Sequence, residues 1–533
     1  MLIYRFYINK YDCKINLYFP SILHFPTFPY TRTHMPNRKI YTNTLAQIAG
    51  KIITALISIF LIKVLTNYLD VAGYGLYSKI YNFLSIFAVI ADLWLYTITV
   101  RELTKYADDA TMVAKISGNI LSLRTLSGVL IVFLSLSIAP FLTGYNSTMA
   151  LIGIFIVSLF TLVWLVNSSL MSYLQATLHT EFSLIANTCG KLLTFGMILM
   201  FASILFPKNI TSEIEIFTVV MIAWLAGNIL MTGLTWWYAS RYQSIRFAWD
   251  KKYIKHILHL SLPYWLALFL GVIFFKVDII LLSLIEDTSI ADTSIALYAL
   301  PMKIVEVGMM YGTIFLNSLL PVLTTAIEKR DQQKIESLTW KWFELLFGFG
   351  LAIALFWYTY APEIINIIST TEFISTTVLG YNAIDAMKIV IWIFLFYFVS
   401  SLSTYIMIAR WEQSRMMWIN GSIAVLNIIG NLIVISHYSF IGSAWITLGT
   451  QILLMSITWW YVRDTIHIRR SLIFIIFMTL IALIGITISK YGIQILSLWD
   501  IWIQSIILQI IAWWTIFGSI YLGGWYSIRK IIR

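Results

Sequence analysis

The sequence predicts an all-α, polytopic membrane protein with about fourteen transmembrane helices. Of its 533 residues, 59% are hydrophobic and 11% are charged, whereas a soluble domain carries about 25% charged residues. The hydrophobic residues gather in runs of about 20, long enough for a helix to cross a bilayer. The lysines and arginines between these runs fall on alternate connections, as expected of a chain that crosses the membrane repeatedly. Composition, run length and charge placement therefore indicate the same fold class.

The first 34 residues do not have the pattern of a secretory signal, because charges and prolines interrupt every apolar run. Met35 opens a short basic segment, MPNRKIYTNT, directly before the first long run. We expect residues 1–39 to be an N-terminal tail, with translation starting at Met1 or at Met35. The apolar runs then predict spans at 43–68, 76–99, 117–139, 149–171, 181–206, 215–239, 257–285, 295–321, 340–361, 379–408, 416–436, 440–461, 471–489 and 500–523.

Positive charge marks one set of connections, and both chain ends belong to that set. Its members include Arg101, Lys105, Lys115, Arg241, Arg246, Lys251, Lys252, Lys255, Lys329, Arg330, Lys334, Arg410, Arg415, Arg463, Arg469 and Arg470. The opposite set is mainly acidic, with Lys79, Lys208 and Lys490 as exceptions, and holds Glu213, Glu215, Glu286, Asp287, Asp292, Glu363 and Glu372. Basic connections stay in the cytoplasm, so we expect both termini there.

A weak internal repeat suggests two lobes. IFLIKVLTNYL (59–69) and GLYSKIYNFL (75–84) match IFFKVDIILL (273–282) and ALYALPMKIVEV (296–307). Six spans separate the copies, so both would face the same way, with a binding site between them; a chance match of apolar letters is the alternative. We predict an N-lobe over 40–240, a basic cytoplasmic linker over 241–255, a C-lobe over 256–465, and two extra helices with a basic tail over 466–533.

Charged side chains inside the predicted spans are the candidate site residues. Each costs roughly 2.5–3.5 kcal/mol at mid-membrane, so such groups face a shared polar interior. For Asp92 the alternative is hydrogen bonding between helices, and for Arg124 and Lys191 it is snorkelling to the interface. Basic groups outnumber acidic ones, which favours an anionic passenger. The candidate substrate-binding residues are Lys51, Lys63, Asp92, Arg124, Lys191, Lys276, Asp278, Lys303 and Glu306.

The sequence carries none of the enzyme signatures that we sought. It has no GxxxxGK[ST] loop for ATP. Cys13 and Cys189 are its two cysteines, and His256 and His259 have no further metal ligands beside them. We expect no enzymatic activity, no catalytic residue, no metal and no resident cofactor. The basic loops are explained by topology, so no nucleic-acid partner is expected.

Two groups of motifs resemble a known family. Residues 65–103 contain Gly73-Tyr74-Gly75, Asp92-Leu93-Trp94 and Arg101-Glu102, and the later stretch contains Pro263, Lys276-Val277-Asp278, Tyr298, Lys303 with Glu306, and Leu320-Pro321. This pattern resembles the polysaccharide (O-antigen) exporters, the Wzx-type flippases of the MATE/MurJ superfamily. One departure is Trp94, where the family often has glycine. The likeness extends over most of residues 40–460.

The resemblance implies a flippase that moves a polyprenyl-diphosphate-linked oligosaccharide from the cytoplasmic to the outer face of the inner membrane by alternating access. It implies that Lys303 occupies a basic position that contacts the diphosphate, whereas Lys51 and Lys63 match only by helix and residue type. Membrane lipids and a polysaccharide polymerase are the implied partners, and a coupling ion, Na⁺ or H⁺, stays open. The alternatives are a multidrug cation antiporter of the MATE type and a polytopic glycan polymerase or ligase.

Overall fold

The computed structural model describes residues 37–532, apart from 93–94, 107, 178, 209, 243–245, 466–467 and 499–505. Met35 and nearly all of the predicted tail 1–39 lie outside these described residues. The chain divides into two units, Met1–Thr42 and Asn43–Arg533. The packing and the site described below belong to the second unit.

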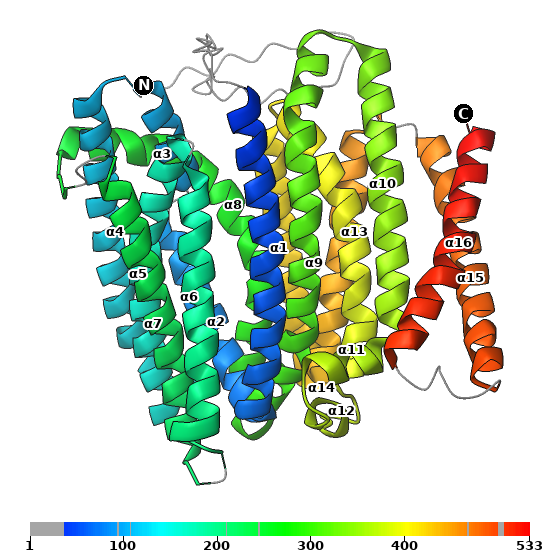
Figure 1. Cartoon of the computed structure of the whole chain (residues 1–533), viewed down its shortest axis with the longest axis horizontal. Coiled ribbons are helices and arrows are strands. Elements are labelled where there is room, and N and C mark those ends of the chain that lie inside the picture. Colours follow the sequence, from blue (N-terminus) through cyan, green and yellow to red (C-terminus); the bar gives the residue numbers. More distant parts are fainter. Residues whose placement is uncertain are drawn as a thin grey trace. The chain divides into compact units, whose positions relative to one another are not determined.

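The described residues form helices and no strand (Figure 1). Short helical turns follow α4 (η1, Ala139–Phe141) and α6 (η2, Phe201–Leu205). The α-helices are α1 (Asn37–Tyr68), α2 (Val71–Asp92), α3 (Leu95–Lys105), α4 (Ala110–Ile138), α5 (Thr148–Ala176), α6 (Thr180–Met200), α7 (Glu213–Ser240), α8 (Lys251–Ile285), α9 (Thr288–Glu328), α10 (Gln332–Thr359), α11 (Ala361–Ile368), α12 (Glu372–Ser375), α13 (Ala383–Ala409), α14 (Gln413–Tyr461), α15 (Ile468–Leu498) and α16 (Ile506–Ile532).

The predicted fold class, all-α and polytopic, is confirmed. Within the described residues, nine helical segments are long and apolar enough to cross a membrane, so the chain is a multi-pass membrane protein. The predicted spans 416–436 and 440–461 both fall in α14, which is interrupted at Ser439 by a backbone with φ 52° and ψ −143°. The predicted span 76–99 falls on α2 and α3. The count of fourteen spans stays a prediction.

Side-chain caps explain where several helices begin. At α7, the Ser212 hydroxyl accepts a hydrogen bond from the Glu215 amide, and the Glu215 carboxylate accepts one from the Ser212 amide. Asn382 and Asp385 form the same reciprocal pair at α13. Such a capping box satisfies backbone N–H groups that have no partner within the helix. The Asp385 carboxylate therefore has a structural role at a helix start.

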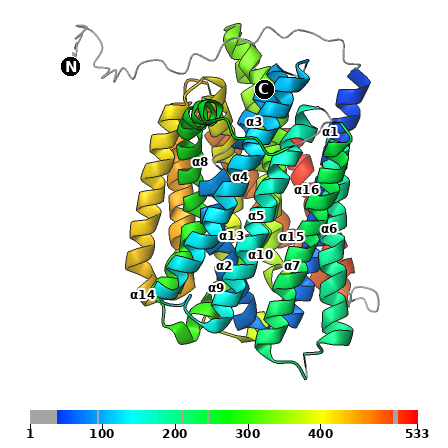
Figure 2. The ribbon, with the colours of Figure 1, turned by 90° about the vertical axis from the view of Figure 1, so that its left-hand side faces the viewer.

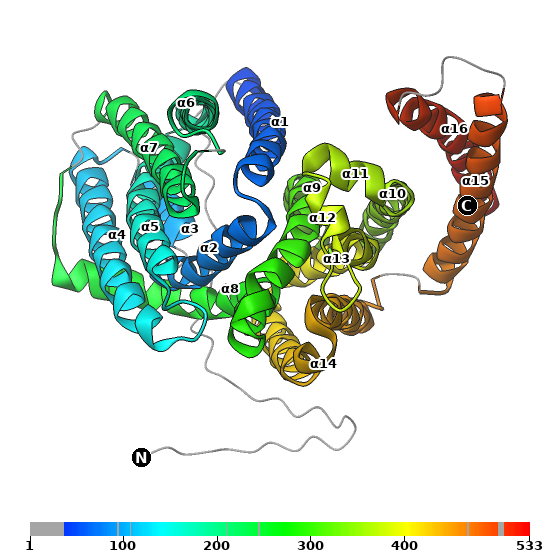
Figure 3. The ribbon, with the colours of Figure 1, turned by 90° about the horizontal axis from the view of Figure 1, so that it is seen from below.

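The helices pack in two groups, the first made of α4 to α7 and the second of α8, α9, α10, α13 and α14, and α2 contacts both groups. Helices α4, α5 and α7 pack side by side and against α2, and α6 packs on α7 and α5 (Figure 3). In the later half, α13 packs on α9, α10 and α14, and α14 lies along α8 (Figure 2). Helices α15 and α16 pair with each other, and α15 also contacts α10. Helix α2 contacts α8 and α9, so it lies where the two groups meet. The two-lobe division stays a prediction.

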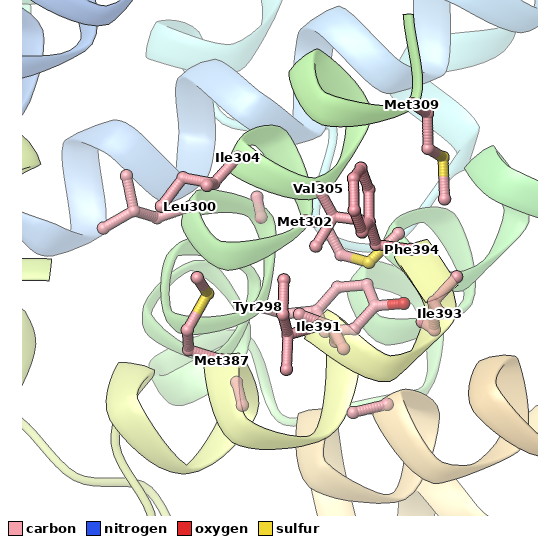
Figure 4. Close-up of a cluster of buried hydrophobic side chains, with 14 of the residues drawn as sticks. Tyr298, Leu300, Met302, Ile304, Val305, Met309, Met387, Ile391, Ile393 and Phe394 are labelled. Carbon is pink, nitrogen blue, oxygen red and sulfur yellow. The ribbon is translucent and has the colours of Figure 1, made fainter. Parts of the chain in front are cut away.

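The seam between α9 and α13 fixes α9 tightly. Met302 and Val305 of α9 lie beside Phe394 of α13 (Figure 4), and all three are buried. A Cβ at Gly308 would lie 2.7 Å from the Phe394 ring, so only glycine permits this approach without movement. This face of α9 is apolar, which leaves its polar residues for another face.

The predicted basic linker is held against α4. The Ala248 amide donates to the Ser122 hydroxyl at 3.1 Å, and the Asp250 amide donates to Asn119 Oδ1 at 2.6 Å. Asp250 also accepts from the amides at the start of α8 and pairs with Lys115 at 2.6 Å. Hydrogen bonds lower the pKa of the Asp250 carboxyl below its ordinary value, and the hydrogen bond from Lys115 has the largest effect. Residues 251–255 of the predicted linker are the first residues of α8.

Reporter fusions test the predicted orientation. Fusions after Lys105, Lys252 and Lys334 are expected to report a cytoplasmic location, because these connections carry the basic residues. Fusions near Asp287 and Glu372 are expected to report the opposite side. A phosphatase reporter that is active only outside the cytoplasm measures both sets. One inverted pair of neighbouring fusions would contradict the predicted path of the chain.

Candidate substrate cavity

A cavity of about 380 Å³ lies among α1, α2, α5, α6, α7, α8 and α9. Its lining residues come from both groups of helices, because α2, which also lines it, lies where the two groups meet. Four of the candidate residues from the sequence line it: Lys191, Lys276, Lys303 and Glu306. These are the only charged side chains among its lining residues in the described part of the chain. Three lysines against one glutamate give the lining a surplus of two positive charges.

Lys276, Lys303 and Glu306 form what we call the ionic cluster. The two oxygens of Glu306 are used separately: Oε1 lies 2.6 Å from Lys276 Nζ, and Oε2 lies 3.1 Å from Lys303 Nζ. Lys303 and Glu306 are three residues apart on α9, close enough to pair along the helix, and Lys276 reaches them from α8. One carboxylate therefore holds two ammonium groups at the cavity wall.

Lys191 supplies the third positive charge from α6. Its ammonium donates to the Ser58 hydroxyl at 2.8 Å and to the Thr54 carbonyl at 3.1 Å, both on α1. These partners are neutral, so they orient the ammonium group without cancelling its charge. The charge of Lys191 is available to a ligand in the cavity.

Lys63 takes part in a contact between helices outside the cavity lining. Its ammonium donates to the carbonyl oxygens of Asn366, at 2.9 Å, and Ser369, at the end of α11. Carbonyls at a helix C-terminus lack intrahelical partners and attract cations. Lys79 makes another contact between helices. Its ammonium group forms a 2.5 Å ion pair with Asp292 of α9, and the Lys79 side chain is 3% exposed. These contacts hold α1 and α2 against the later helices.

A close approach of two backbones accompanies the Lys79–Asp292 pair. A Cβ on Gly75 would lie 1.7 Å from the carbonyl oxygen of Asp292, so only glycine allows α2 and α9 to meet there. The Tyr74 ring contacts the Phe373 ring edge to face, with centroids 5.7 Å apart. The connections at this end of the helices are the acidic ones that we predict to lie outside the cytoplasm. Helices α2 and α9 are therefore packed directly against each other at that end.

Asp92 and Arg124 pair with each other rather than lining the cavity. Their ion pair is 2.6 Å long, and the Arg124 side chain is 0% exposed. Arg124 also donates to Ser169 of α5, so the pair ties α2 to α4 and α5. Removing one partner would leave a buried charge uncompensated. Neither snorkelling of Arg124 nor a cavity role for Asp92 accounts for this geometry. The side chain of Lys51 lies outside the described residues.

Asp278 lies in a separate polar cluster, buried among α8, α9 and α14. Its side chain is 1% exposed. The Tyr298 hydroxyl donates to Oδ2 at 2.7 Å, Thr447 donates to the same oxygen, and Asn431 Nδ2 donates to Oδ1 at 2.9 Å. Asn427 Oδ1 accepts from the same Asn431 amide at 3.1 Å. We call Asp278, Tyr298, Asn427, Asn431 and Thr447 the Asp278 cluster.

The chemistry of the Asp278 cluster suits a small cation. Oxygen atoms of carboxylate, amide and hydroxyl groups are ligands for hard cations, and a buried carboxylate is also a place to hold a proton. The Asn431 carbonyl oxygen is buried without a hydrogen-bond partner in the described part of the protein. Among the described residues, no group of three or more His, Cys, Asp or Glu side chains could hold a metal ion.

Comparison with protein families identifies the chain. A family model described as polysaccharide biosynthesis protein matches residues 40–327, more than half of the sequence. The chain belongs to this family. The matched region includes nearly all of α1, all of α2 to α8 and nearly all of α9, so the cavity and the ionic cluster lie within it. No curated protein matches the chain.

Solved structures show that this polysaccharide biosynthesis protein has the MATE/MurJ fold. The lipid II flippase MurJ, in an inward closed conformation, is 15% identical with a TM-score of 0.67, covering 92% of this chain and 100% of that one. An inward-facing multidrug resistance MATE family transporter of the MOP superfamily is 16% identical with a TM-score of 0.62, covering 79% and 94%. Its outward-facing counterpart gives a TM-score of 0.53 at 15% identity, covering 79% and 95%. The fold that the motif resemblance implied is confirmed.

Sequence reasoning missed some of the residues that shape this family member's polar sites. Thr447, Asn427 and Asn431 were not among the candidate residues from the sequence. Tyr74, Tyr77 and Tyr81 of α2 line the cavity, and their spacing of three and four residues is the signal that could have found them, because it keeps side chains on one helical face. Lys79 was assigned to a connection, whereas it is buried in an ion pair.

Proposed function

We propose that this protein is a flippase for a polyprenyl-diphosphate-linked oligosaccharide, the repeat unit of a polysaccharide. The substrate moves from the cytoplasmic to the outer face of the inner membrane by alternating access. The observation that carries the proposal is the ionic cluster in a cavity with surplus positive charge. Membership of the polysaccharide biosynthesis family supports it, and so does the likeness to a lipid II flippase.

The ionic cluster suits a diphosphate because its two ammonium groups are held by one carboxylate. A diphosphate carries more negative charge than Glu306 and offers more acceptor oxygens, so it can replace the carboxylate at both Lys276 and Lys303. Charge-assisted hydrogen bonds of this kind contribute about 1.5–3 kcal/mol each. Lys191 approaches from α6, on the other group of helices, and can bind the same anion. Binding would then draw the two groups together around the ligand.

The Asp278 cluster is the proposed coupling site. We assign it the exchange of a proton or a monovalent cation, because its carboxylate lies deep in the later helices and forms hydrogen bonds with neutral donors. Tyr298 lines the cavity and also donates to Asp278. A change in the charge state of Asp278 can therefore reach the cavity through one side chain.

Alternating access requires the contacts of Lys63 and Lys79 to break in part of the cycle. They hold α1 and α2 to α11 and α9 at the end that carries the acidic connections. With both termini in the cytoplasm, this end faces outward, and the oligosaccharide leaves there when the contacts open. A polysaccharide polymerase acting at the outer face is the partner that would receive the lipid-linked unit.

The multidrug antiporter alternative needs a cavity that favours a cationic passenger. Here the lining residues carry three lysines and a single glutamate, and that glutamate is already paired with two of them. A polymerase or ligase would need a reactive group exposed to the glycan, and the charges lining the cavity are those of an anion-binding site. Both alternatives therefore fit the cavity less well than the flippase.

Binding by the purified protein in detergent tests the proposed substrate class. We expect polyprenyl diphosphate to raise the thermal midpoint and to bind at least tenfold more tightly than the uncharged polyprenol, because the ionic cluster contacts only the diphosphate. A lipophilic cation such as tetraphenylphosphonium should bind weakly. Tight binding of the cation with no preference for the diphosphate over the polyprenol would contradict the proposal.

A further inference from the structure

The cavity also has an uncharged wall, formed by side chains of α2, α5 and α7. Six aromatic side chains make up what we call the aromatic wall: Tyr74, Tyr77, Tyr81, Phe160, Trp164 and Trp224. Tyr77 is central, with ring centroids 6.1 Å from Trp224 and 6.3 Å from Tyr81. Trp224 in turn meets Phe160 edge to face at 6.4 Å. The Tyr74 ring centroid lies 6.0 Å from that of Tyr77, so ring contacts connect five of the six aromatic side chains, all but Trp164.

Polar atoms without partners lie among these rings. Asn82 and Asn167 line the cavity and are buried, Asn167 with 1% of its side chain exposed. The side-chain oxygens of both, and the indole nitrogen of Trp224, are buried and have no hydrogen-bond partner among the described residues. A buried polar group left unpaired costs about 1–3 kcal/mol. Two acceptors and one donor beside a cavity therefore indicate a ligand that carries both kinds of polar group.

A sugar ring has this combination of surfaces. A pyranose presents C–H groups on one face, which stack on aromatic rings, and hydroxyl or acetamido groups around its edge, which donate and accept hydrogen bonds. Ligand sites commonly pair apolar and aromatic side chains with a few polar groups that fix orientation. The wall carries no charged residue among its described members, so it does not favour an acidic sugar.

Tyr81 connects the aromatic wall to the ionic cluster. Lys303 Nζ lies 5.4 Å from the centroid of the Tyr81 ring, within the range of a cation–π contact. A diphosphate held by Lys303 would therefore place one of the two groups bonded to it, the polyprenyl chain or the sugar, against Tyr81 and Tyr77. The unpaired polar atoms of Asn82, Asn167 and Trp224 favour the sugar. In a polyprenyl-diphosphate-linked oligosaccharide, the sugar bonded to the diphosphate is the first sugar.

We propose that the aromatic wall binds the first sugar of the substrate, and that this sugar is uncharged. Tyr77 and Trp224 stack on the ring, while Asn82 and Asn167 hydrogen-bond its edge. The inference rests on the proposed function, since it places the sugar by way of the diphosphate. It goes beyond that function because it assigns separate residues to sugar recognition.

The test compares two lipid probes on the full-length purified protein. The probes are polyprenyl diphosphate and the same lipid carrying a single N-acetylhexosamine. The wild-type protein is expected to bind the glycosylated probe about tenfold more tightly, the effect of satisfying one or two buried polar groups. Trp224→Leu and Asn167→Ala are each expected to remove this preference and to leave binding of the sugar-free probe unchanged. Trp445→Leu, which changes a tryptophan 58% exposed on α14, is the matched control and should keep the preference.

The outcomes separate this inference from the proposed function. If the wild-type protein binds both probes equally, or if Trp224→Leu and Asn167→Ala weaken both probes alike, the aromatic wall does not recognise the sugar. If the sugar-free diphosphate binds no better than polyprenol, the proposed function itself fails. Unchanged binding of the sugar-free probe also shows that a variant is folded, so a loss of preference cannot be attributed to misfolding.

Discussion

Replacing Lys276 and Lys303 together by alanine is expected to abolish transport. The two ammonium groups are the charged hydrogen-bond donors of the ionic cluster, and each lies within 3.1 Å of a Glu306 oxygen. If each contributes about 1.5–3 kcal/mol to binding the diphosphate, the double variant should bind it about 100-fold or more weakly. Transport of lipid-linked oligosaccharide is measured at matched protein levels in the membrane.

Charge-preserving variants make this prediction specific. Lys276→Arg and Lys303→Arg should each retain part of the transport, because the positive charge persists. Glu306→Gln should weaken transport less than the loss of either lysine, because Glu306 orients the lysines but does not contact the diphosphate. A cation antiporter predicts the reverse order, with Glu306 essential and the lysines dispensable. Tolerance of alanine at both lysines would contradict a cationic cavity.

Replacing Asp278 by asparagine is expected to reduce transport at least tenfold while leaving binding of the diphosphate unchanged. Asparagine keeps the size of the side chain but removes the charge and turns one acceptor into a donor, which faces the donors of Tyr298, Thr447 and Asn431. Unpaired or opposed buried polar groups cost about 1–3 kcal/mol each. The variant should therefore bind substrate but fail to complete the cycle.

Two measurements on the Asp278→Asn protein decide this point. Binding of polyprenyl diphosphate should match the wild type, and transport should no longer respond to an imposed proton or sodium gradient. Asp385→Asn is the control, since Asp385 is a carboxylate in a helix cap and its loss should leave the response to the gradient intact. Transport by Asp278→Asn that still follows the gradient would exclude the Asp278 cluster as the coupling site.

The sequence predicted the fold class and part of the cavity for the same physical reason. Charges are costly in lipid, so Lys276, Lys303 and Glu306 in adjacent spans had to share a polar interior, and the structure brings them together. Asp278 was grouped with them, yet it lies two residues after Lys276. At 100° per residue, two residues in a helix point about 200° apart, which places Asp278 on the other side of α8. Helical geometry alone could have separated the two.

Other partners lay beyond what local sequence can show. Lys63 donates to carbonyl groups of Asn366 and Ser369, about three hundred residues later in the chain, and backbone carbonyls leave no trace in side-chain composition. Arg124 and Asp92 face each other across two helices, a pairing that depends on how α2 and α4 rotate about their axes. Periodicity assigns a residue to a face, whereas only packing decides which face it meets.

Flipping by the purified protein in lipid vesicles tests the central claim most directly. The vesicles contain a polyprenyl-diphosphate-linked oligosaccharide in both leaflets, and a soluble enzyme that cannot cross the membrane modifies the sugars facing outward. Vesicles with the wild-type protein should make the inward-facing fraction accessible as well, because the protein moves it across. Vesicles with the Lys276→Ala, Lys303→Ala double variant should keep that fraction protected. If the wild-type and double-variant vesicles protect the same fraction, the protein does not flip this lipid through the ionic cluster.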